Sequence, residues 1–153
     1  MHINESAPVI ARREIEVAAS PELVWDLLSR MDRWADWNPE VKTASQPALQ
    51  EGAVFRWKAG PAALTSTLRQ VERPQVLGWT GTSMGMKAVH IWRLEAHGRQ
   101  TLARTEESWS GTLPRLLPGV MRRSLQKTLD SWLHHLKIEA EARAAGSAPR
   151  MTF

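Results

Sequence analysis

An apolar stripe within residues 114–145 constrains the fold of this chain more than any other feature. Hydrophobic and small side chains recur there at steps of three and four residues, which is the spacing of one face of an α-helix. The stripe consists of Leu117, Met121, Leu125, Thr128, Leu129, Trp132, Leu133, Leu136 and Ala140. It predicts one helix from Pro114 to Ala145, with Pro118 as an alternative first residue and Gly146 as the stop signal. Such a helix is ~40 Å long, so a broad apolar surface has to cover it.

A series of short β segments supplies that surface. Alternating polar and apolar residues predict a first strand at 9–18. Six more strands, separated by turns that contain glycine or proline, are predicted at 41–46, 53–59, 63–72, 76–82, 84–96 and 100–110. Ser20 as N-cap and Pro21 at the first helical position predict a short helix after the first strand, and 31–37 a second turn. Because short turns join strands into antiparallel sheets, we expect an α+β fold with a curved sheet around the long helix.

The length and composition of the chain limit its organisation. The 153 residues suit one domain, expected at 9–145, with flexible tails at 1–8 and 146–153. No apolar run approaches a membrane span, and 1–8 lacks the pattern of a secretion signal, so a cytoplasmic location is expected. A net charge of +4, without aromatic residues interleaved in one basic stretch, does not predict nucleic-acid binding.

The types of residue present exclude several kinds of site. The chain has no cysteine, which rules out disulfides and thiolate metal ligands. His134 and His135 are adjacent on the predicted helix and point in different directions, so they do not form a metal pair. No phosphate-binding loop or serine-nucleophile motif is found. We expect neither a metal nor a cofactor.

Residues 19–41 carry the most specific motif in the chain. It combines a small-polar-proline start, the pair Val24-Trp25 and the run Trp34-x-x-Trp37-Asn38-Pro39. Further matches are Gly52 with Phe55 and Trp57, Leu77-Gly78-Trp79, His90-Ile91-Trp92-Arg93-Leu94, and Glu107-Ser108-Trp109-Ser110-Gly111. Through these motifs residues 9–140 resemble the polyketide cyclase/dehydrase branch of the START-like, or SRPBCC, superfamily. The resemblance implies a helix-grip fold of about seven strands, with a hydrophobic cavity between the sheet and the first half of the long helix.

Side-chain alternation predicts which residues face that cavity. If residues 97–100 form the last hairpin loop, Trp92 faces Thr105 and His90 faces Glu107 on the same side of the sheet. The predicted ligand-binding residues are Phe55, Trp57, Ser66, Leu68, Trp79, Met86, His90, Trp92, Thr105, Glu107, Trp109, Leu117, Met121 and Leu125. His90 and Glu107 are also the candidate catalytic residues, although a structural hydrogen bond between two half-buried polar groups is the favoured interpretation.

Three functions follow from the resemblance, which by itself implies the fold and not the ligand. The first is binding of a small hydrophobic molecule, lipid-like or aromatic, by a monomer or homodimer. The second is a cyclase or dehydratase in which His90 and Glu107 move protons. The third is a protein-interaction domain similar to the activator of a heat-shock ATPase. A basic run, Arg115, Arg122, Arg123 and Lys127, is followed by no acid until Asp130 and suits either a solvated face or transient contact with an anionic membrane.

Overall fold

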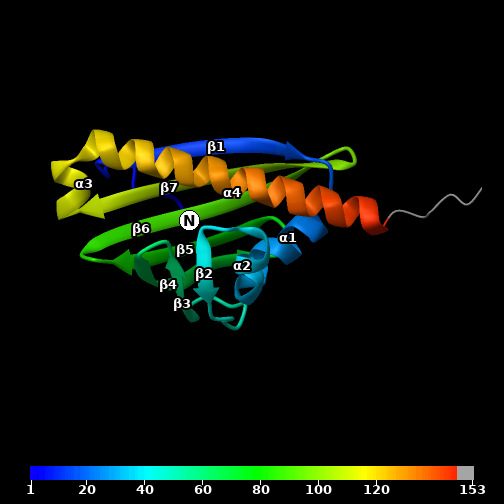
Figure 1. Ribbon diagram of the computed structural model, residues 1–153, viewed down its shortest axis with the longest axis horizontal. Coiled ribbons are helices and arrows are strands. Elements are labelled where there is room, and N and C mark those ends of the chain that lie inside the picture. The colour runs from blue at the N-terminus through cyan, green and yellow to red at the C-terminus, as the bar shows by residue number, and fades with distance from the viewer. Residues whose placement is uncertain (148–153) are drawn as a thin grey trace, which may run out of the picture.

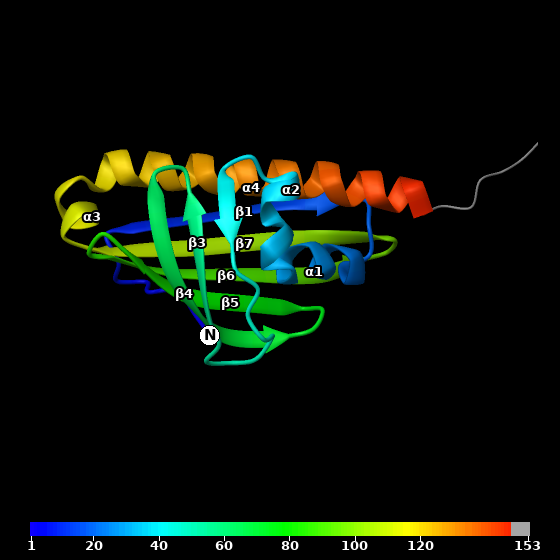
Figure 2. The ribbon, with the colours of Figure 1, turned by 60° about the horizontal axis from the view of Figure 1, so that its bottom comes forward.

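The computed structural model describes residues 1–147, and its main feature is a curved antiparallel sheet under one long helix (Figures 1 and 2). The strand order across the sheet is β1-β7-β6-β5-β4-β3-β2. The strands are β1 (Val9–Val17), β2 (Val41–Ala44), β3 (Val54–Ala59), β4 (Ala62–Glu72), β5 (Val76–Ser83), β6 (Met86–His97) and β7 (Gln100–Gly111). The helices are α1 (Pro21–Ser29), η1 (Met31–Arg33), α2 (Trp34–Trp37), α3 (Thr112–Leu116) and α4 (Pro118–Ser147). The α+β prediction is confirmed.

The register of the last two strands matches the prediction. Ala96 pairs with Thr101 and His90 with Glu107, so both polar side chains lie on the face toward α4. The start of β6 differs, because Met84 and Gly85 form the turn before it, with φ of 50° and 75°. Two consecutive positive φ values are typical of a two-residue hairpin turn. The strand therefore begins at Met86 and not at residue 84.

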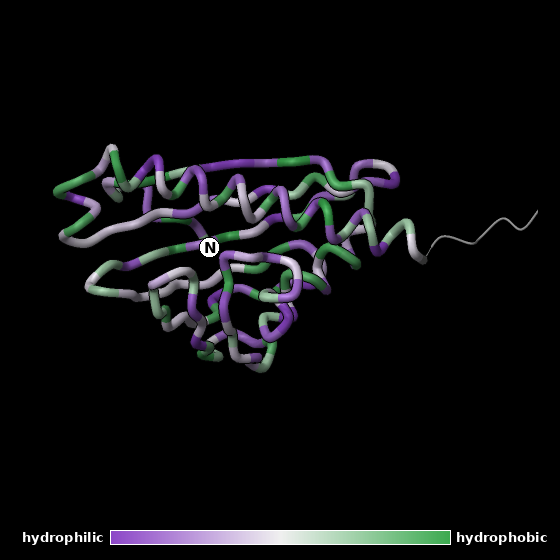
Figure 3. The backbone as a smooth tube through the Cα atoms, in the orientation of Figure 1, coloured by the Kyte–Doolittle hydropathy of each residue, from purple (hydrophilic) through white to green (hydrophobic). Residues whose placement is uncertain are grey.

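Both ends of the long helix differ from the predicted Pro114 and Ala145. The helix α4 begins later, at Pro118, and ends later, at Ser147. Leu117 separates α3 from α4 with φ −127° and ψ 56°, outside the helical region. A residue before proline is disfavoured in helical conformation, and Pro118 fits the first helical position, where no N–H is needed. At the other end Gly146 does not stop α4, which continues to Ser147 within the described residues. Figure 3 shows hydrophobic and hydrophilic residues alternating in short segments along α4.

The insertion between β1 and β2 brings Trp34 into the centre of the core. Ser20 caps α1 by accepting a hydrogen bond from the Leu23 N–H at 3.2 Å. η1 and α2 then turn the chain so that Trp34 is fully buried and its indole N–H donates to the Leu28 carbonyl at 3.0 Å. The centroid of the Trp34 ring lies within 6 Å of the centroids of four other aromatic rings, those of Phe55, Trp57, Trp79 and Trp132.

Residues at the start of the predicted tail, 1–8, contact the sheet. Ile3 is buried, and the Asn4 N–H donates to Ser108 Oγ at 3.0 Å. Arg93 donates to the Met1 carbonyl at 3.0 Å. Since Ser108 alternates with Glu107 in β7, these contacts lie on the sheet face opposite α4. The other predicted tail falls largely at 148–153, outside the described residues.

A carboxylate connects the C-terminal half of α4 to the end of β1. Glu141 Oε2 accepts from the Ala18 N–H at 2.9 Å and from Lys137 Nζ at 2.6 Å. Lys137 Nζ also donates to the Glu16 carbonyl at 2.7 Å. The backbone donor first, and then the ammonium group, hold the pKa of Glu141 below its ordinary value of 4.5.

Glu141→Gln is expected to lower the thermal midpoint at neutral pH and to leave it unchanged in acid. A carboxyl group whose pKa is lower in the folded state stabilises the fold above its unfolded value of 4.5, and this contribution is lost as the pH falls through the folded value. Thermal unfolding at about pH 7 and about pH 3 measures it, with the exposed Glu51→Gln as control. An equal loss at both pH values would contradict the linkage.

Candidate functional site

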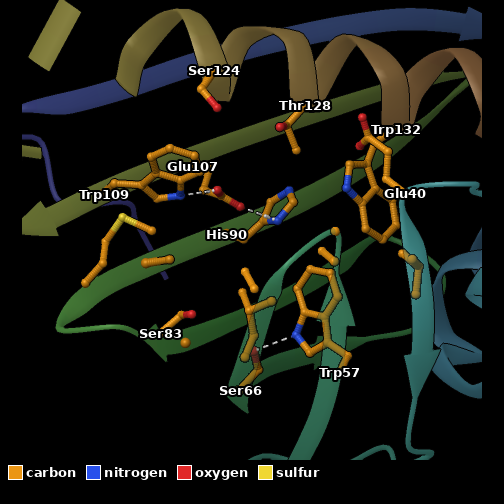
Figure 4. Close-up of a pocket in the computed structure, with 18 of the residues that line it drawn as sticks. Glu40, Trp57, Ser66, Ser83, His90, Glu107, Trp109, Ser124, Thr128 and Trp132 are labelled. Carbon is orange, nitrogen blue, oxygen red and sulfur yellow. Dashed lines mark hydrogen bonds and ion pairs between the residues drawn. The ribbon is translucent and has the colours of Figure 1, made fainter. Parts of the chain in front are cut away.

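A cavity of about 440 Å³ lies between the concave face of the sheet and α4 (Figure 4). Its walls come from the start of β2, the β3–β4 turn, β3 to β7 and one face of α4. The exposed members of the wall mark its opening; they are Pro39, Glu40, Lys42, Pro61, Thr82 and Ser124. The cavity thus opens between the β2 and β3–β4 region on one side and α4 on the other.

Half of the predicted ligand-binding residues line this cavity. These are Trp57, Ser66, Trp79, Met86, His90, Glu107 and Trp109. They share the period-two alternation of their strands, which explains why sequence patterning identifies them.

The other predicted residues do not line the cavity. They are Phe55, Leu68, Trp92, Thr105, Leu117, Met121 and Leu125. Phe55, Trp92 and Thr105 are on the expected side of the sheet but are covered by neighbouring side chains. Leu125 packs with Val9 of β1, because the first half of α4 lies over that strand.

The sequence pattern placed Thr128 and Trp132 on the apolar stripe of the long helix, but it predicted no α4 residue that lines the cavity. Ser124, Thr128 and Trp132 follow one another at steps of four residues and all line the cavity. This face is turned by about 100° from the Leu125 face. The cavity also includes Gly81, where an added Cβ would lie 2.9 Å from Ser66 Oγ. The lack of a side chain at Gly81 therefore keeps this part of the floor open.

His90 and Glu107 form a buried polar pair in the cavity wall (Figure 4). His90 Nδ1 lies 2.6 Å from Glu107 Oε1, and the indole N–H of Trp109 donates to Glu107 Oε2. Because a carboxylate only accepts hydrogen bonds, His90 carries a hydrogen on Nδ1. His90 Nε2 lies 2.7 Å from Thr105 Oγ1. Both ring nitrogens and both carboxylate oxygens therefore have partners inside the protein.

The order Thr105, His90, Glu107 has the connectivity of a hydrolytic triad, with a hydroxyl, an imidazole and a carboxylate in sequence. A triad nucleophile has to reach the substrate. Thr105 is only 2% exposed and does not line the cavity. Its hydroxyl orients the imidazole and is not placed to attack a ligand.

Aromatic rings make up much of the remaining wall. The rings of Trp79 and His90 have centroids 4.8 Å apart, and Trp57 donates its indole N–H to Ser66 Oγ at 3.0 Å. Trp132 closes the wall on the α4 side. These indoles present flat apolar faces, and Ser66, His90 and Glu107 beside them already have hydrogen-bond partners. Within residues 1–147 no group of three histidine or acidic side chains is placed to hold a metal ion.

Comparison with known proteins assigns the chain to a family. Residues 8–141 match the family model described as polyketide cyclase / dehydrase and lipid transport. No curated protein matches. Among solved structures, the chain is similar to a hypothetical protein from Helicobacter pylori, with a TM-score of 0.80 and 15% identity over 90% of this chain and 91% of the other.

Two further solved structures have the same fold. A START superfamily protein from Mycobacterium smegmatis gives a TM-score of 0.76 and 19% identity, covering 87% of this chain and 97% of the other. The Zhui aromatase/cyclase from Streptomyces sp. R1128 gives a TM-score of 0.78 and 17% identity, covering 92% of this chain and 98% of the other. At these identities the likeness establishes the helix-grip fold alone. Together with the match over residues 8–141, it shows that this chain belongs to the polyketide cyclase / dehydrase and lipid transport family.

Proposed function

We propose that the cavity binds a small hydrophobic molecule, lipid-like or aromatic. The observation that carries this proposal is the cavity volume of about 440 Å³, with Trp57, Trp79, Trp109 and Trp132 in its wall. Ligand pockets in proteins have volumes of roughly 300–1,000 Å³ and mostly apolar walls with a few placed polar groups. The cavity is therefore large enough for a ligand of moderate size and offers mainly apolar contact.

The charges around the cavity favour a ligand whose buried part is uncharged. Inside, both ring nitrogens of His90 and both carboxylate oxygens of Glu107 are hydrogen-bonded within the protein. The remaining ionisable side chains of the wall, Glu40 and Lys42, are exposed at the opening. Burying an isolated charge is strongly unfavourable, so a polar group of the ligand belongs at the opening and its apolar part inside.

Ala88→Phe is expected to weaken binding of an apolar probe at least about tenfold, because the added ring occupies the cavity. Titration with N-phenyl-1-naphthylamine, followed by the fluorescence of the probe and of tryptophan, measures this affinity. The probe is uncharged and does not respond to basic surfaces. Ala63→Phe is the matched control, since Ala63 is exposed and outside the cavity. Absence of saturable binding by the unaltered protein, or equal affinities of the two variants, would overturn the proposal.

A second candidate is a cyclase or dehydratase that uses the same cavity. His90 and Glu107, 2.6 Å apart and both in the wall, are the observation that favours it. Positioning of a reactive chain and one proton transfer are sufficient for such chemistry. The saturation of both side chains by Thr105 and Trp109 favours binding over catalysis, because a general acid or base has to reach the substrate.

A further inference from the structure

Large apolar side chains are exposed together at one end of the molecule. They belong to the β5–β6 turn, to α3, to the residue between α3 and α4 and to the first turn of α4, and we call this region the α3 end. Its members are Met84, 90% exposed, Leu113, 48%, Leu116, 70%, Leu117, 49%, and Val120, 65%. Figures 1 and 2 show α3 and the β5–β6 turn at the same end of the ribbon. Met86 pairs with Gly111, which keeps the turn beside the start of α3.

The α3 end is also basic. No acidic residue occurs between Glu107 and Asp130, a stretch that contains Arg115, Arg122, Arg123 and Lys127. Lys87, next to the β5–β6 turn, adds a fifth cation. None of these five has an ion pair with another residue of 1–147, whereas Arg12, Arg73 and Arg104, elsewhere on the surface, all pair with glutamates. The net charge of +4 of the whole chain thus corresponds to an excess of positive charge at one end.

The α3 end borders the opening of the cavity. On α4, Val120, Arg123 and Lys127 are spaced three and four residues apart and share a face, next to Ser124 of the cavity wall. In the β5–β6 hairpin, Met84 lies between Ser83 and Met86, and both of these line the cavity. The exposed apolar side chains and the cations therefore lie beside the same opening.

We propose that the α3 end docks on the surface of a bilayer that contains anionic phospholipid. Binding to such a surface is strengthened by two contributions, the insertion of apolar side chains and the attraction of cations to anionic headgroups. Both are present on a single end, and the positive charge is complementary to an anionic surface. The apolar residues lie on a turn and a short helix, with Met84 and Leu116 at least 70% exposed. Projecting side chains of this kind suit insertion between lipids better than a protein groove. The surface is a property of the fold and does not depend on what the cavity binds.

Co-sedimentation with vesicles tests the docking surface. We expect the full chain to bind vesicles of phosphatidylcholine with about 30% phosphatidylglycerol, to bind pure phosphatidylcholine at least about tenfold more weakly, and to lose affinity as salt rises. Arg123→Gln with Lys127→Gln should weaken binding to the anionic vesicles by about tenfold or more. Leu116→Ser with Val120→Ser should do the same through lost insertion.

Matched controls use residues away from the α3 end. Arg56→Gln with Arg99→Gln removes two other exposed cations, and Val54→Ser with Ile138→Ser removes two other exposed apolar side chains. Both controls should bind anionic vesicles within about twofold of the unaltered protein. Circular dichroism checks that every variant folds.

Three results would overturn the proposal. One is the absence of binding to anionic vesicles at low salt, which would leave an acidic protein surface as the partner. The second is unchanged binding after Leu116→Ser with Val120→Ser, which would reduce the contact to adsorption of cations. The third is a loss of affinity for anionic vesicles in the control variants equal to that in the variants of the α3 end. All variants of the α3 end should bind N-phenyl-1-naphthylamine like the unaltered protein, so failure of docking and failure of ligand binding are distinguishable.

Discussion

Trp34→Ala is expected to lower the free energy of unfolding by about 3–5 kcal/mol, the range for removal of a buried aromatic side chain. Trp34 has no exposed surface and contacts the rings of four aromatic residues from β3, β5 and α4. The substitution leaves a void among these rings and strands the Leu28 carbonyl, which accepts from the indole. A void of this size next to rigid indoles cannot close by small movements, since interiors are close-packed.

Urea unfolding followed by far-ultraviolet circular dichroism measures this change without relying on tryptophan emission. Trp34→Phe is the control, because it keeps most of the apolar contact and loses only the hydrogen bond and part of the ring. Trp34→Phe should lower the free energy of unfolding clearly less than Trp34→Ala does. A loss below about 1 kcal/mol for Trp34→Ala would show that the surrounding rings repack, and would contradict the central position of Trp34 in the core.

Glu107→Ala is expected to lower the free energy of unfolding by roughly 1–3 kcal/mol, the range for stranding a buried polar partner. The substitution removes the acceptor of both the His90 ring and the Trp109 indole. Glu107→Gln retains a carbonyl oxygen and should be destabilised much less. If the pair serves structure, His90→Gln and Glu107→Gln should bind an apolar probe nearly as the unaltered protein does.

The same two amide variants decide between the binding protein and the enzyme. General acid–base catalysis typically contributes ~10²–10⁴-fold, so a catalytic pair would lose turnover by that factor while folding and probe affinity stay intact. We expect the structural outcome, because each polar atom of the pair already has a partner within the protein. Normal stability of Glu107→Ala would remove the structural explanation.

The polar pair was predictable from sequence because strand geometry is local. A short turn at Gly98, with φ 62°, joins β6 and β7, and the alternation of side chains then carries the register back to His90 and Glu107. The same reasoning gives Trp57, Trp79 and Trp109. Alternation predicts only the side of the sheet on which a side chain lies. It therefore included Trp92 among the ligand-binding residues, although other side chains cover Trp92 completely.

The helical wall of the cavity was not predictable in the same way. Apolar periodicity identifies the buried face of α4, but a cavity is bordered by residues at the edge of that face. Leu125 and Leu129 pack against β1, so Ser124 and Thr128 are left beside the open space. Which edge this is depends on where the helix crosses the sheet, and that position is set by contacts between residues far apart in the sequence. The break at Leu117, by contrast, was indicated by Pro118.

The pairing of β1 with β7 affects how the chain folds during synthesis. Val9 pairs with Trp109, so β1 gains its neighbour only after about a hundred more residues have been added. At roughly 5–20 residues per second, this takes about 5–20 s. The strands from β2 to β6 follow one another and can form hairpins as they emerge, whereas Val9 and Ala11, buried in the finished fold, have to wait. A nascent chain that stalls before β7 therefore presents an unpaired first strand with apolar side chains, a suitable binding segment for a chaperone.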